Sequence, residues 1–204
     1  MARAHSPSLR DDAAPKPCVG LLETASVAIG LQTADAVLWQ SPVEMLFCEP
    51  VSPGRFAMIF TGEVEEVASS LRRGAEVAAG ELVDEVIIPN LEPAVLDALR
   101  GRFREATLDA LGILETSTIA SVVLAADAAC KSAVVAPVEL RLANGLGGKA
   151  FVTLVGEVGD VRVALAVGAE AASRRGNLVR EVLIAGPHPD LARHLRAPSA
   201  RSRS

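Results

Sequence analysis

Apolar positions along the chain form short continuous runs that alternate with longer stretches of helical spacing. The runs are typical of strands, and the stretches with apolar residues three or four positions apart are typical of amphipathic helices. Gly80 and Gly176 follow two of these helical stretches and are expected to end them. In the first half of the chain this pattern predicts strands at 19–23, 43–48, 55–60 and 82–88, a helix capped by Thr24 or Ser26, a helix over 63–79 and a short helix over 93–99.

The whole pattern occurs twice. GLLETASVAIGLQTADA at 20–36 matches GILETSTIASVVLAADA at 112–128, and GEVEEV at 62–67 matches GEVGDV at 156–161. Each copy has the order β-α-β-β-α-β, the split βαβ arrangement, in which helices cover one face of the sheet and leave the other face free. We therefore predict an α+β protein with two tandem ferredoxin-like domains. The expected boundaries are 1–17 for a disordered tail, 18–100 for the first domain, 101–110 for a linker, 111–195 for the second domain and 196–204 for a disordered basic tail.

Composition excludes several classes of protein. Hydrophobic residues make up 50% of the 204 residues and aromatic residues only 3%, so the core is built from small side chains. No long apolar stretch lacks charges, which excludes a transmembrane helix, and the polar first 17 residues lack a secretory signal. The net charge of −5 and the few aromatic residues argue against nucleic-acid binding. Three widely spaced cysteines indicate neither a disulfide framework nor a zinc site, and a reducing cytosol is the expected compartment.

Candidate catalytic chemistry is sparse. His188 and His194 are six positions apart, which is wrong for two metal ligands on one helix face, so we expect no metal and no enzyme activity. Glu23 and Glu115 occupy equivalent positions at strand ends, where capping of the nearby helix is favoured over acid–base chemistry. The glycine-rich segment 145–149 lacks the spacing of a Walker loop and indicates either a tight turn or an anion-binding turn.

The two copies also place short turn-rich segments at equivalent positions. PVSPGR at 50–55 occupies the position of NGLGGK at 144–149, and a cation ends both. Together with the repeated motifs above and with VIIPN and VLIAGPHP, these segments resemble bacterial microcompartment shell proteins over residues 18–195, specifically the tandem-domain class in unpermuted order. Several motifs agree in order and spacing, twice over.

The resemblance implies a trimeric, pseudohexagonal tile without a cofactor, which joins hexameric and pentameric shell proteins around encapsulated enzymes. Six domains would surround a central pore for small metabolites. Carried over by position, the pore-lining residues are Val51, Ser52, Pro53, Gly54, Gly145, Leu146, Gly147 and Gly148.

The sequence departs from the family pattern in two places. One branch, from propanediol-utilisation shells, has a cysteine before Pro-Gly-Lys of the first loop, and three such cysteines hold an iron–sulfur cluster; Ser52 stands at that position. At the tile edge the family often has a lysine near the end of the first helix. Lys131 occupies that position in the second copy and Trp39 in the first, and the alternatives are a solvated helix end for Lys131 and burial for Trp39.

Two other functions stay open: a trimeric ferredoxin-like regulator that binds a small molecule, and an iron–sulfur electron-transfer shell protein.

Overall fold

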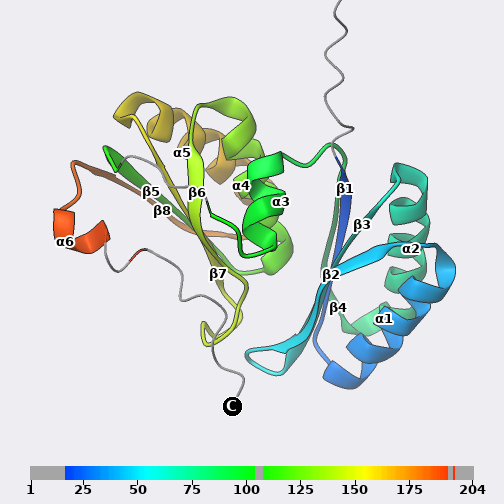
Figure 1. Cartoon of the computed structure of the whole chain (residues 1–204). Coiled ribbons are helices and arrows are strands. Elements are labelled where there is room, and N and C mark those ends of the chain that lie inside the picture. The colour runs from blue at the N-terminus through cyan, green and yellow to red at the C-terminus, as the bar shows by residue number, and fades with distance from the viewer. Residues whose placement is uncertain (1–16, 104–107, 193–194, 196–204) are drawn as a thin grey trace, which may run out of the picture.

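The computed structural model describes residues 17–103, 108–192 and 195, and its two halves repeat one order of elements (Figure 1). The first half contains β1 (Cys18–Thr24), α1 (Val27–Gln40), β2 (Glu44–Val51), β3 (Arg55–Gly62), α2 (Val64–Ala78), the 3-10 turn η1 (Ala79–Glu81), β4 (Leu82–Ile88) and α3 (Pro93–Leu99). The second half contains β5 (Ala110–Thr116), α4 (Ile119–Ser132), β6 (Ala136–Arg141), β7 (Ala150–Gly156), α5 (Val158–Ser173), β8 (Leu178–Ala185) and α6 (Pro189–Ala192). The predicted α+β fold with two split βαβ units is confirmed.

The two antiparallel sheets have equivalent strand orders, β2-β3-β1-β4 and β6-β7-β5-β8. Equivalence extends to single residues. Glu23 lies opposite Asp84 in the β1–β4 ladder, and Glu115 lies opposite Arg180 in the β5–β8 ladder. Both ladders shift register directly after the glutamate. The halves can therefore be compared residue by residue at this edge of each sheet.

Local sequence explains where the helices begin and end. The hydroxyl of Ser26 accepts a hydrogen bond from the Ile29 amide at the start of α1, and Thr118 caps α4 in the same way. Gly176 has a φ of +71° and follows α5 as predicted. In the first half the prediction for Gly80 was wrong in detail, because Ala79 takes the positive φ of +45° instead.

Two hydrophobic clusters form the interior. One lies between the first sheet and its own helices and is centred on Phe56, Met58 and Phe60. The backbone of α1 approaches the sheet so closely that a Cβ at Gly30 would lie 2.3 Å from the Phe56 side chain. The other cluster runs from the opposite face of the first sheet through α4 into the second half. The free face of the first sheet is therefore covered by a helix of the second half, and Figure 1 shows α3 and α4 at the centre of the molecule between the two sheets.

Candidate pore loops and the contact between the halves

The two turn-rich segments lie next to each other in the structure. The amide of Gly145 donates a hydrogen bond to the Ser52 hydroxyl oxygen over 3.4 Å. A Cβ at Gly148 would lie 3.2 Å from Cδ of Pro53, so the Gly148 backbone lies close to the Pro53 ring. Of the residues predicted to line a pore, Pro53, Gly54, Gly145 and Gly147 are exposed, Ser52 and Leu146 are half-buried, and Val51 and Gly148 are buried. The structure thus brings together two loops that are about 90 residues apart in the chain.

The glycine-rich loop forms a tight turn. Gly145, Gly147 and Gly148 have φ values of +74°, +62° and +91°, which favour glycine strongly over other residues. The Leu146 amide donates to the carbonyl of Ala143, and the Lys149 amide donates to that of Leu146. The amides of Leu146, Lys149 and Gly145 thus have acceptors within the protein, which favours the tight turn of the two alternatives.

A carboxylate holds the cation that follows each loop. Arg55 Nη1 donates to Glu23 Oε1 over 2.9 Å, and Lys149 Nζ donates to Glu115 Oε1 over 3.0 Å. The first pair is well covered, with the Glu23 side chain 1% exposed, and the second is open, with Glu115 at 32%. Burial raises the pKa of Glu23, against the opposing effects of the hydrogen bond from the Ile119 amide and of Arg55.

Glu23 also joins the two halves. Its Oε2 accepts a hydrogen bond from the backbone amide of Ile119, the first residue of α4, over 3.0 Å. The predicted role as a helix cap is correct in kind, but the capped helix belongs to the other half and not to the neighbouring α1. The negative carboxylate faces the positive end of the α4 dipole, which favours this contact.

A second carboxylate at the same contact gathers four side chains from the second half. Asp84, on β4, accepts hydrogen bonds from Thr118 Oγ1 over 2.6 Å and from Ser121 Oγ over 3.3 Å. Asn177 donates to the same carboxylate over 3.3 Å, and Arg175 forms an ion pair with it. No motif in the sequence predicts this cluster. Its one signal in the sequence is a change of sign, because the repeat-equivalent of Asp84 is Arg180.

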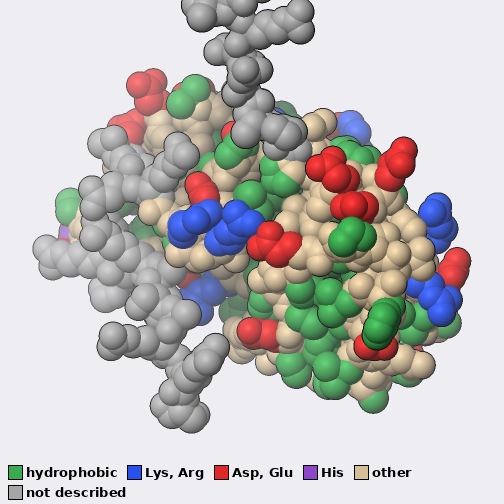
Figure 2. Space-filling view, turned by 45° about the vertical axis from the view of Figure 1, so that its right-hand side comes forward, with side chains coloured by type: hydrophobic (Ala, Val, Ile, Leu, Met, Phe, Trp, Pro, Cys, Tyr) green, Lys and Arg blue, Asp and Glu red, His purple; other side chains and the backbone are tan. Residues whose placement is uncertain are grey.

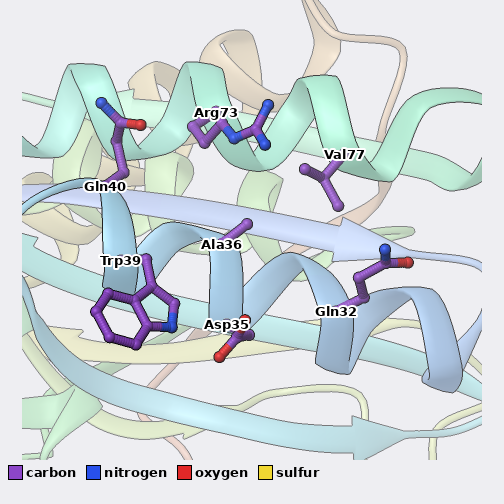
Figure 3. A pocket seen from close by; sticks show the side chains of 7 residues that line it. All are labelled: Gln32, Asp35, Ala36, Trp39, Gln40, Arg73 and Val77. Carbon is purple, nitrogen blue, oxygen red and sulfur yellow. The ribbon is translucent and has the colours of Figure 1, made fainter.

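The candidate tile-edge residues lie at equivalent positions of α1 and α4 and differ in their surroundings. Lys131 Nζ donates to Asp127 Oδ2 over 2.6 Å, and the other oxygen of Asp127 accepts from the Glu92 amide over 2.8 Å. Trp39 is 84% exposed, so the alternative of burial within the chain is wrong. It borders a groove of about 330 Å³ between α1 and α2, and Figure 3 shows it beside Asp35, with Arg73 and Val77 on the neighbouring helix.

The thiols do not fit an iron–sulfur cluster at the loops. Ser52 offers a hydroxyl where thiolate would be needed, and Cys48 packs against the cluster around Phe56. Burial, with Glu92 and Asp127 nearby, raises the pKa of Cys130 to about 12. Within the described residues no group of three His, Cys, Asp or Glu side chains is arranged to hold a metal ion. His188 is exposed at the start of α6, and His194 lies outside the described residues.

These features define a protein of two tandem split βαβ domains whose equivalent loops meet and whose second domain covers the free sheet face of the first. The BMC domain model matches residues 18–91 and 110–187, and the chain belongs to this family. It is 34% identical to the bacterial microcompartment shell protein PduT of Citrobacter freundii, over 87% of this chain and 96% of that protein. It is 28% identical to the carboxysome assembly protein CcmO of a Synechocystis strain, over 90% of this chain and 67% of that protein.

A crystal structure of a microcompartments protein from Desulfitobacterium hafniense DCB matches with a TM-score of 0.80 and 42% identity, over 87% of this chain and 98% of that one. The identification as a tandem-domain microcompartment shell protein is confirmed. The comparisons support neither a small-molecule regulator nor an electron-transfer role. Among the described residues, no helix has the length and apolar character needed to cross a membrane.

Proposed function

We propose that three copies of this chain close into a pseudohexagonal tile of a microcompartment shell, with a central pore lined by the two loops. The tile joins hexameric and pentameric shell proteins around encapsulated enzymes and has no catalytic activity of its own. Each chain would contribute two shell domains to the tile, residues 18–100 and residues 111–195. The relatives named above are shell or assembly proteins, which supports a structural role.

The contact between the loops at Ser52 and Gly145 carries the proposal. The two loops occupy equivalent positions in their domains and nevertheless lie side by side, joined by a hydrogen bond. If further domains continue the same relation around an axis, all six loops converge on it. The mouth would then alternate a proline-containing turn with a glycine-rich turn. Backbone N–H groups of the loops and the Ser52 hydroxyls would face the passage, which suits small polar metabolites.

The outer edge of the tile is proposed to contain Trp39 and Lys131. Trp39 offers an exposed apolar surface with one N–H donor. The exposed part of Lys131 can lie along a neighbouring tile and donate to backbone carbonyls, although its ammonium is also held by Asp127. The two kinds of edge would alternate around the tile.

The proposal is tested by measuring mass and assembly. Light scattering at micromolar concentration is expected to give a trimer, three times 21.2 kDa. Negative-stain microscopy is expected to show sheets, either from this protein alone or with hexameric shell proteins. A monomer under these conditions, or a trimer that enters no sheet or shell with hexameric partners, would contradict the proposal.

A further inference from the structure

Each chain has two complementary surfaces that its own halves leave uncovered. On the first sheet, Val86 is 8% exposed and Leu21 2%, because α4 covers them. On the second sheet, the equivalent of Val86 is Val182, which is 40% exposed. On the helix side, Val123 of α4 is 0% exposed, whereas its equivalent on α1, Leu31, is 57% exposed.

Figure 2 shows hydrophobic side chains gathered on the half of the molecule that carries α1 and α2. The free helix and the free sheet face match the two sides of the contact that the chain already makes internally. They lie on different domains, so a contact between them is head-to-tail and is suited to closing a ring. In the trimer proposed above, the occupant of the free β5–β8 face is α1 of a second copy of this chain.

The helix cap that Glu23 provides inside the chain has a direct equivalent between chains. Inside the chain, Glu23 pairs with Arg55 and accepts from the amide of Ile119. Glu115 pairs with Lys149 in the same way, and it occupies in the β5–β8 ladder the register position that Glu23 occupies in the β1–β4 ladder. The equivalent of Ile119 is Val27, the first residue of α1. Glu115 is therefore positioned to cap α1 of the neighbouring chain through the Val27 amide.

The contact that Asp84 makes inside the chain has an equivalent between chains in which the charge on the sheet is positive instead of negative. Asp84 accepts from Asn177 inside the chain, and the register places Arg180 at the equivalent of Asp84. The equivalent of Asn177 is Glu81. Its backbone shows this, because Ala25 donates to the Glu81 carbonyl over 2.8 Å just as Ser117 donates to the Asn177 carbonyl over 2.9 Å. Where the internal contact has an acid on the sheet, the contact between chains has Arg180 on the sheet and Glu81 on the turn beside the helix.

We propose that Arg180 of one chain pairs with Glu81 of the next, so that the contact between chains has the opposite charge order to the contact within each chain. The proposal rests on the trimer proposed above. Because α4 already covers the first sheet within each chain, the free sheet face of the second domain and the free helix of the first domain are the surfaces left to meet. Opposite charges then face each other at both kinds of contact, Asp84 with Arg175 inside the chain and Arg180 with Glu81 between chains.

A charge-swap series tests the pairing by sedimentation velocity over a range of protein concentrations. R180E and E81R are each expected to raise the concentration at which half of the trimer dissociates by at least about tenfold. The double variant R180E/E81R is expected to return this concentration to within about threefold of the parent. R162E and E65R, reversals at exposed positions of α5 and α2, are the matched controls and are expected to leave it unchanged.

The outcomes separate the two proposals. If the parent protein sediments as a monomer, the trimer itself is refuted. If the parent is a trimer that tolerates R180E and E81R, or if the double variant fails to recover, the pairing is refuted and the trimer stands. Both residues are exposed within the chain, so far-UV circular dichroism is expected to be unchanged in each variant. R180A serves as a second variant, with a smaller effect in the same direction because it removes attraction without adding repulsion.

Discussion

Replacement of Asp84 by alanine tests how firmly the two halves are held together. The Asp84 side chain is 7% exposed and pairs with Arg175, whose side chain is 31% exposed. Removing the carboxylate leaves Arg175, Thr118 and Ser121 without this acceptor. Loss of one partner of a buried ion pair costs about 3–5 kcal/mol, and the partial exposure of Arg175 places the estimate at about 3 kcal/mol. For a chain of this length that corresponds to a fall in Tm of about 6–12 °C.

The assay is urea denaturation followed by circular dichroism at one fixed protein concentration, because self-association adds to apparent stability. Asp84→Asn keeps one acceptor oxygen and is expected to lose about half as much free energy of unfolding. Glu76→Ala, which removes an exposed ion pair with Arg73, is the control and is expected to change stability by less than about 0.5 kcal/mol. If Asp84→Ala unfolds at the same urea concentration as the parent, the cluster adds no net stability and the reasoning from burial fails.

Four further predictions concern the loops, the thiols and the edge. Ser52→Glu and Leu146→Glu are expected to alter solute passage through assembled shells but to leave the trimer intact, because both side chains lie on turns outside the core; unfolding of either variant would place these turns in the core. Protein isolated anaerobically is expected to be colourless, and cysteine-dependent visible absorbance would contradict this. With a pKa of about 12, Cys130 is about one part in ten thousand thiolate at pH 8, so Ellman's reagent should modify it only after unfolding; rapid modification of the folded protein would show that it is accessible. Lys131→Ala is expected to weaken assembly into sheets with little change in trimer mass, and normal sheets would remove Lys131 from the edge.

The secondary structure was predictable because its signals are local. Continuous apolar runs predicted the strands, and apolar residues three or four positions apart predicted the principal helices. Ser26 was a recognisable helix cap. The repeat also pointed to the two loops as equivalent positions. Their contact through Ser52 and Gly145 was not predictable, because it depends on how one domain docks on the other.

The same limit applies to the contact between the halves. Glu23 and Ile119 are 96 residues apart, and no local pattern indicates that the carboxylate of one caps the helix of the other. The substitution of Arg180 for Asp84 between copies was visible in the sequence, but its meaning required the register of both ladders. The exposure of Trp39 was likewise undecided, since an apolar residue on a helix stripe fits burial in its own domain or in a neighbouring chain.

The covalent link between the halves changes the mass action of assembly. In a ring of six separate domains, every contact must form between free molecules, and the ring disappears steeply on dilution. Here α4 docks on the first sheet within one chain, so half of the contacts form at an effective concentration set by the short segment between α3 and β5. In the proposed ring of three chains, only three contacts between chains then remain to be made. If the proposed tile forms, the linked chain is expected to assemble at lower concentrations than six separate domains would, and each dissociated chain keeps its two domains already paired.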